Sequence, residues 1–237
     1  MDILFNKLII DLYYNYSEYV MIILIIFMVY KIYIEGCPKL NYNNIKKSYN
    51  NIKKDLDTGD LVLFCSSDYI GKVIRKFSNY YFSHCGIIIR HNNQLYVLEC
   101  DMDSNYDFIT QKEDKYGVHL VSLDDKLKDY TGNIFGYCKL EKNNINELKL
   151  NNIINECQNI EFNNNVFAWY SSRLKNNNIS NFLKNKNRMF CSEFVAYVYQ
   201  KLGILKQNNL PNMYTIEDLQ SNKYNNIMFS KLILFKT

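Results

Sequence analysis

The stretch that decides the fold is NRMFCSEFVAYVYQKLGI, residues 187–204. The apolar residues after Cys191 recur with the spacing of one helix face: Phe194, Val195, Val198, Tyr199 and Leu202. Cys191 falls on the same stripe, so the spacing predicts that its thiol points inward from the first helical turn. Gly203 follows the last residue of the stripe, where a glycine commonly ends a helix.

A thiol in the first turn of a helix has two interpretations. The helix dipole stabilises a thiolate there, which would make Cys191 a reactive nucleophile. The alternative is a buried free cysteine that packs as a small hydrophobic side chain. The choice depends on whether the chain also supplies a base.

Length and composition limit the possible classes. The chain has 237 residues, 48% of them hydrophobic, which suits one domain with a real core plus an appendage. A net charge of +4, without a dense basic block in the globular part, argues against a nucleic-acid partner.

The cysteines indicate a reduced protein without a metal site. Seven cysteines, odd in number and without a CxxC pair, are typical of free thiols in a domain that faces the cytosol. The spacing of the histidines and cysteines fits no standard zinc finger or zincin, so we expect no metal and no cofactor. A zinc-binding module remains an alternative.

An apolar N-terminal segment predicts a membrane anchor. Residues 19–30 carry no charge, the apolar run continues to Ile34, and tyrosines lie at both ends, as in interfacial aromatic belts. We therefore expect an anchor at 1–38 with a span over about 17–34. Five lysines follow before Asp55, so residues 39–56 are predicted to be a basic linker on the cytosolic side, near anionic headgroups.

The rest of the chain, 57–237, predicts an α+β domain with a mainly antiparallel sheet. Strands are expected near 61–64, 83–90, 94–101, 116–123, 133–140 and 227–235. Helices are expected at 69–78, at 145–160 and from Cys191 onward, with asparagine-rich loops between the last two.

His84 is the candidate base. The loop at 91–93 makes its strand one half of a hairpin, and residues of one parity share a face of a strand. Either Glu99 or Asp101 can therefore flank His84 and hold its imidazole in one tautomer. Gly86 leaves that face of the strand open to a close approach. The alternative is a buried structural histidine beside a solvated carboxylate.

Several segments resemble one known family. They are GDLVLF (59–64), FSHCGIII (82–89), LYVLEC (95–100), FCSEFVAYVYQKLGI (190–204) and PNMYTIEDLQSN (211–222). In this order they resemble the circularly permuted papain-like fold of the NlpC-type superfamily. The nearest branches are the YiiX-like and poxviral cysteine hydrolases, and the latter would imply a viral source. Lecithin:retinol acyltransferase relatives are more distant.

The resemblance covers about 57–237 and implies roles for individual residues. Cys191 matches the nucleophile, His84 the base and Glu99 the polar third member of the triad. His119 matches no catalytic position, so we expect it to be structural. The asparagine-rich stretch 142–187 has no counterpart in the family pattern.

Together these features predict a membrane-anchored cysteine hydrolase that cleaves amide, ester or thioester bonds through a thioester acyl-enzyme. The alternatives are an acyltransferase on the same fold and an inactive, membrane-tethered binding module. Tyr80, Tyr81 and Phe82 precede His84 and would form an aromatic wall beside the reacting carbonyl, unless they are ordinary core residues. With the anchor, this wall favours membrane lipid as a partner and acylated lipids or lipidated proteins over free peptides as substrates.

Overall fold

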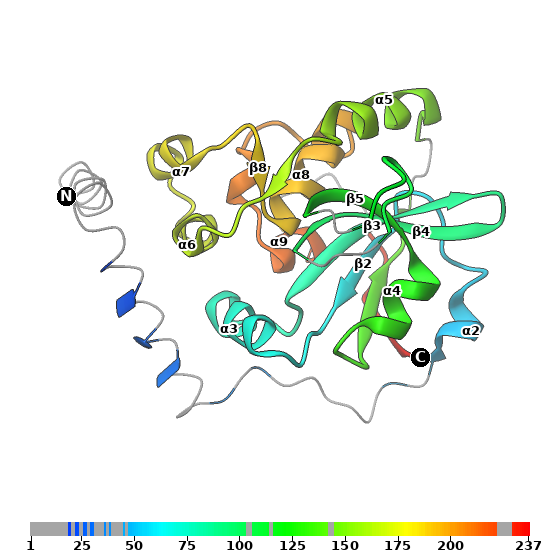
Figure 1. Ribbon diagram of the computed structural model, residues 1–237, viewed down its shortest axis with the longest axis horizontal. Coiled ribbons are helices and arrows are strands. Elements are labelled where there is room, and N and C mark those ends of the chain that lie inside the picture. The colour runs from blue at the N-terminus through cyan, green and yellow to red at the C-terminus, as the bar shows by residue number, and fades with distance from the viewer. Residues whose placement is uncertain are drawn as a thin grey trace.

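The fold is a mixed α+β domain built on one large sheet (Figure 1). The computed structural model describes residues 19, 22–23, 26–27, 29–30, 36, 38, 45, 47–102, 106–113, 116–141, 145–221 and 229–237. The strand order is β1-β9-β6-β2-β3-β4-β5, and every neighbouring pair is antiparallel except β1–β9. The predicted antiparallel α+β architecture is therefore confirmed.

All six predicted strands are present in the large sheet, which also contains one strand that was not predicted, β1. The strands of this sheet are β1 (Lys47–Ser48), β2 (Leu61–Phe64), β3 (His84–His91), β4 (Gln94–Asp101), β5 (Gly117–Ser122), β6 (Phe135–Cys138) and β9 (Ile233–Lys236). A separate parallel pair joins β7 (Glu161–Phe162) to β8 (Arg188–Met189). The helices are α2 (Tyr49–Ile52), α3 (Tyr69–Ser78), α4 (Leu123–Asp129), α5 (Glu147–Cys157), α6 (Val166–Leu174), α7 (Asn177–Leu183), α8 (Cys191–Leu202), the 3-10 turn η2 (Pro211–Met213) and α9 (Ile216–Gln220).

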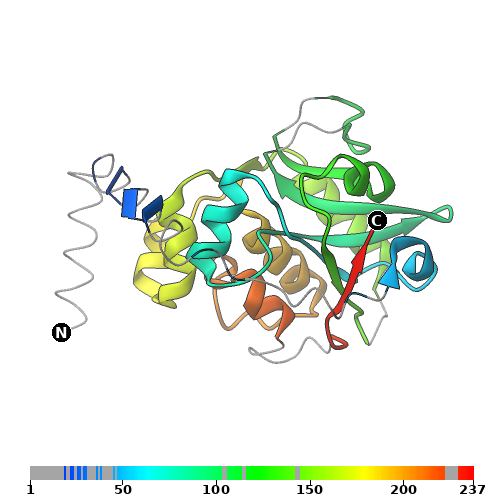
Figure 2. The ribbon, with the colours of Figure 1, turned by 90° about the horizontal axis from the view of Figure 1, so that it is seen from below.

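Each face of the sheet has its own core, because alternate strand residues point to opposite faces. On one face, Cys85 and Ile87 of β3 belong to the same buried cluster as Phe194 and Val198 of α8. On the other face, Ile88 packs in a cluster that includes residues of α2 and α4. Figure 1 shows α6, α7, α8 and α9 gathered at one side of the sheet, with α2 at the far end. The view in Figure 2 shows the last strand, β9, extending along the sheet to the C-terminus.

Helix α8 forms as its sequence predicts. It begins at Cys191 and ends where Gly203 adopts a left-handed conformation with φ of 81°. Its predicted apolar stripe is buried except at Leu202, which is half-buried, and the Tyr199 hydroxyl donates a buried hydrogen bond of 3.0 Å to the carbonyl of Gly59. This bond ties the central helix to the turn that leads into β2.

The segment before residue 57 differs from the sequence prediction. Residues 47–56 were expected in the linker, but Lys47 pairs with Phe235 of β9, and Ile52 and Leu56 are fully buried. The segment was assigned to the linker because of its lysines, but two of its apolar residues, Ile52 and Leu56, cover the sheet. The predicted span at 17–34 lies mostly outside the described residues, and within the described part of the chain no helix is long and apolar enough to cross a membrane.

Two further expectations were wrong. The asparagine-rich loops before Cys191 contain α6 and α7, because Asn165 and Asn176 accept hydrogen bonds from the first backbone N–H groups of these helices. The proposed aromatic wall is core: Tyr80 and Phe82 are buried in the cluster beneath α8. Burial of these large rings against the sheet leaves them no substrate-facing surface.

Replacing Tyr199 by Phe should destabilise the domain without altering the site. The change leaves the buried Gly59 carbonyl without its donor, so we expect the free energy of unfolding to fall by about 1–2 kcal/mol. Urea denaturation measures this loss. Tyr197→Phe, at a half-buried position on the same helix, is the matched control and should change little; equal effects of the two substitutions would contradict the role assigned to this bond.

Candidate active site

Cys191 occupies the first position of α8 and is almost fully buried. Phe190 precedes it as the N-cap residue, and the Phe190 side chain makes no capping hydrogen bond. The thiol therefore lies at a helix N-terminus whose backbone N–H groups favour a negative charge. This is the inward position that the apolar stripe predicts.

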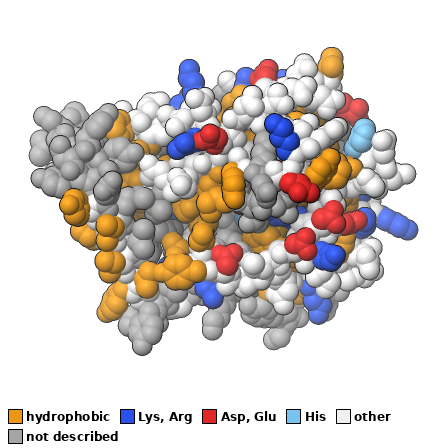
Figure 3. Space-filling model, in the orientation of Figure 1, with side chains coloured by type: hydrophobic (Ala, Val, Ile, Leu, Met, Phe, Trp, Pro, Cys, Tyr) orange, Lys and Arg blue, Asp and Glu red, His pale blue; other side chains and the backbone are white. Residues whose placement is uncertain are grey.

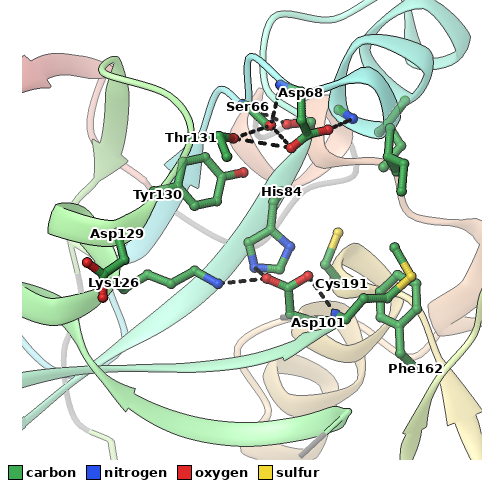
Figure 4. Close-up of a pocket in the computed structure, with 15 residues that line it drawn as sticks. Ser66, Asp68, His84, Asp101, Lys126, Asp129, Tyr130, Thr131, Phe162 and Cys191 are labelled. Carbon is green, nitrogen blue, oxygen red and sulfur yellow. Dashed lines mark hydrogen bonds and ion pairs between the residues drawn. The ribbon is translucent and has the colours of Figure 1, made fainter. Parts of the chain in front are cut away.

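His84 is the first residue of β3, and its side chain contacts residues from both faces of the sheet. Its imidazole lies beside the Cys191 thiol, so that the two groups shift each other's pKa, and its Nε2 lies 2.7 Å from Oε2 of Glu99. The ring also packs on Phe64, with 5.5 Å between the ring centroids. Figure 4 shows the Cys191 sulfur and the His84 imidazole directed toward each other above β4.

Both carboxylates that the hairpin allowed lie beside His84. Asp101 Oδ2 is 3.5 Å from His84 Nε2, a longer separation than that to Glu99. Gly86 makes room for Glu99: a Cβ at this glycine would stand 3.3 Å from the Glu99 Cβ and only 2.4 Å from Val97 Cγ1. The sequence predicted that Gly86 leaves this face of the strand open, and the structure shows that Val97 and Glu99 of β4 fill the space.

Two further side chains, those of His119 and Lys126, contact Glu99. His119 of β5 places Nε2 3.0 Å from Glu99 Oε1, and Lys126 of α4 places Nζ 2.8 Å from the same oxygen. Lys126 also lies 2.7 Å from Asp101 Oδ2. His119, which the sequence predicted to be structural, thus contacts Glu99 inside the site and restricts the orientation of its carboxylate.

The surroundings favour a thiolate–imidazolium pair. A hydrogen bond from the Cys85 thiol and the contact with His84 lower the pKa of Cys191 to about 5, against the opposing effect of burial. Burial disfavours a charged His84, but Asp101 and Glu99 raise its pKa well above the usual value. Burial equally opposes the charge on Glu99, and Lys126 followed by His84 holds the pKa of that carboxyl well below its usual range.

A cleft with two lobes opens on Cys191. The polar lobe has a volume of ≈ 310 Å³, and its polar lining includes Ser66, Asp68, Asp101, Lys126, Asp129 and Thr131. The smaller apolar lobe, ≈ 60 Å³, is lined by Ile74, Phe162, Trp169, Phe190 and Ile216. Cys191 and Ser83 border both lobes, so the thiol lies at their junction. Figure 3 shows hydrophobic and acidic side chains side by side on the face that Figure 1 presents.

The carboxylate cluster resembles a cation site, but the ammonium group of Lys126 already contacts both carboxylates. Ligand atoms of His84, Glu99 and Asp101 lie within 4.8 Å of one another. The Lys126 ammonium contacts both carboxylates at 2.7–2.8 Å, which is where a metal ion would have to bind. The donor set therefore does not fit a metal unless Lys126 moves away. His91, another potential zinc ligand, lies at the opposite end of β3.

Sequence reasoning missed Cys85 and Lys126. Cys85 directly follows His84, but its contact with Cys191 depends on how α8 packs on the sheet. Lys126 belongs to LDDKLKD, a segment that reads as a short surface helix. A buried lysine four residues before Tyr130, whose ring it approaches to 5.6 Å, leaves no distinctive pattern in the sequence.

The geometry defines the class of a papain-like cysteine hydrolase, with a helix-borne thiol, an imidazole and a carboxylate in contact. A family model of permuted papain-like amidases, YaeF/YiiX, C92 family, matches residues 55–226. The chain belongs to this family.

Comparison with solved structures finds similar chains, among them one from Escherichia coli. The crystal structure of the metalloprotein yiiX from Escherichia coli O157:H7 is 18% identical, with a TM-score of 0.45 over 75% of this chain and 88% of that one. A comparison with curated proteins gives no match. The match to the family model confirms the YiiX-like resemblance, while the poxviral and acyltransferase resemblances find no support in these matches.

The alkylation rate of Cys191 by iodoacetamide should rise with an inflection near pH 5, where its thiolate forms. Cys85→Ala removes the donor to the thiolate and should move the inflection to higher pH. Cys85→Ser keeps a donor at this position and should move it less. Subtracting the rate measured on Cys191→Ala removes labelling of other thiols. An inflection at the ordinary thiol value of about 8.5 would contradict an activated cysteine.

Proposed function

We propose that this protein is a membrane-anchored cysteine hydrolase that removes an acyl group from lipids or lipidated proteins. The observation that carries the proposal is the contact chain from Cys191 to His84 to Glu99 at the junction of the two lobes. Membership of an amidase family supports hydrolysis of a carbonyl bond. The apolar lobe supports an apolar acyl group.

In the proposed reaction, the Cys191 thiolate attacks the carbonyl carbon of the substrate. The charge that develops on the carbonyl oxygen is stabilised by the Cys191 backbone N–H at the start of α8. The imidazolium of His84 gives its proton to the leaving nitrogen, oxygen or sulfur as the bond to the carbonyl carbon breaks. The products of this half-reaction are the free leaving group, a thioester on Cys191 and a neutral His84.

The second half-reaction releases the acyl group. His84 takes a proton from water, and the hydroxide oxygen attacks the thioester carbon. The carbon–sulfur bond breaks, the carboxylic acid leaves, and the thiolate–imidazolium pair is restored. Glu99 accepts a hydrogen bond from His84 Nε2 throughout, which leaves the other ring nitrogen facing the thiol. An alcohol or amine in place of water would make the same site an acyltransferase.

The lobes support an assignment of substrate parts. An acyl chain fits the side lined by Phe162, Trp169 and Ile216, because apolar burial is favourable there. A polar leaving group fits the larger side, lined by hydroxyls and carboxylates. The volume of ≈ 60 Å³ suits a short or partly inserted acyl chain, so the rest of a long chain would extend beyond this lobe.

The proposed anchor would hold this cleft near a bilayer. Its described residues between Tyr19 and Tyr30 are helical, and their large apolar side chains are exposed, as Ile23 at 65% and Ile26 at 62% illustrate. Exposed aliphatic side chains on consecutive turns are unfavourable in water and favourable in lipid.

Full-length protein in mild detergent should hydrolyse acyl-ester or acyl-thioester substrates faster than peptide amides. Parallel assays with matched acyl chains and leaving groups measure this preference. Cys191→Ala should abolish turnover, and His84→Ala should lower it by about 10²-fold or more. Turnover confined to peptide amides would refute the lipid assignment and leave a protease; no turnover with a reactive Cys191 would favour the binding module.

Deletion of residues 1–34 should move the protein from the membrane fraction to the soluble fraction of cells that express it. The catalytic domain should retain its Cys191 labelling, because the deletion ends before β1, which begins at Lys47. A full-length chain that is already soluble would contradict the anchor without affecting the chemistry.

A further inference from the structure

Lys126 lies at the centre of the charged cluster, although it belongs to a helix on the face of the sheet away from α8. Its side chain is 1% exposed, and its Nζ contacts Glu99 Oε1 at 2.8 Å and Asp101 Oδ2 at 2.7 Å. The ammonium also stands over the rings of Phe64, at 5.8 Å, and Tyr130, at 5.6 Å. Figure 4 shows the Lys126 side chain reaching across from α4 to the carboxylate of Asp101.

The need for a cation follows from the spacing on β4. Glu99 and Asp101 lie two residues apart, so both carboxylates point to one face of the strand, and both are largely shielded from water. Two buried like charges raise each other's pKa, and one of them takes up a proton unless a cation compensates.

His84 cannot supply that compensation at every step. In the proposed mechanism its imidazolium gives up a proton to the leaving group, and the ring is then neutral until water is cleaved. During this interval a lone carboxylate pair would bind a proton, and a protonated Glu99 would no longer accept the hydrogen bond that orients His84. The charge of Lys126 does not change during the cycle.

We infer that Lys126 is a positioning residue that keeps Glu99 and Asp101 ionised while the His84 proton is transferred. The claim that Lys126 supports turnover rests on the proposed function. The claim that Lys126 keeps the two carboxylates ionised concerns the resting site and does not depend on that function. The Lys126 ammonium occupies the position between the two carboxylates that a metal ion would otherwise take.

Charged and titratable groups face this cluster from every element around it. They are Glu99 and Asp101 from β4, His84 and Cys85 from β3, His119 from β5, Tyr130 after α4 and Cys191 from α8. Lys126, Glu99 and Asp101 together carry one net negative charge, which balances the His84 imidazolium. Removal of Lys126 leaves two negative charges or forces the uptake of one proton.

The test is Lys126→Met, which keeps the length of the side chain and removes its charge. The alkylation inflection of Cys191 should move up by about one pH unit or more, because an added negative charge opposes ionisation of the thiol, while a protonated Glu99 no longer stabilises the imidazolium that faces it. The acid limb of kcat/KM should move in the same direction, with kcat near neutral pH reduced by about tenfold or more. Lys126→Arg, which keeps the charge, should retain a pH profile closer to that of the wild type.

A second variant distinguishes charge from packing. Lys126→Met combined with Asp101→Asn restores one net negative charge, so both the alkylation inflection and the acid limb should return toward wild-type values. Thermal unfolding of each variant verifies that the fold persists. An unshifted inflection in Lys126→Met, or a double variant no closer to wild type than Lys126→Met alone, would overturn the inference. Alkylation requires no substrate, so these outcomes remain separate from a failure of the proposed hydrolase activity.

Discussion

The position of His84, beside the Cys191 thiol and 2.7 Å from Glu99, is the constraint on which the rest of the structure depends. The thiol comes from α8 on one face of the sheet, and the carboxylate belongs to the layer that α4 covers on the other face. His84 reaches both because it is the first residue of β3, at the end of the sheet. The site therefore requires helices packed on both faces of the sheet, and the two hydrophobic clusters hold those helices in place.

The thiols around the site divide into one charged and two neutral groups. Burial raises the pKa of Cys85 and of Cys100 well above the usual value, so both remain protonated. Cys191 has the opposite shift because it accepts a hydrogen bond from Cys85 and faces the His84 imidazolium. Because burial keeps the Cys85 thiol protonated, Cys85 can donate a hydrogen bond to the thiolate of Cys191.

The sequence predicted those parts of the fold and site that local periodicity encodes. The apolar stripe placed Cys191 in the first turn of α8, and hairpin parity limited the partners of His84 to two carboxylates. Lys126 and the contact between Cys85 and Cys191 could not be predicted, since they depend on packing between elements distant in the chain. The asparagine-rich region was misread because Asn165 and Asn176 cap helices, and a count of asparagines does not distinguish caps from loops.

Strand parity allowed either Glu99 or Asp101 to orient His84. The surroundings of the two carboxylates favour Glu99 for this role. Glu99 is fully buried and meets three cationic or donor side chains, those of His84, His119 and Lys126, so its orientation is fixed from three sides. Asp101 is 14% exposed, lies farther from His84 and borders the polar lobe. A group that must hold an imidazole in one tautomer benefits from the first environment, because a fixed acceptor loses little freedom when it binds the ring. Asp101 is the better placed of the two to sense the charge of a leaving group, since it shares the lobe in which that group would lie.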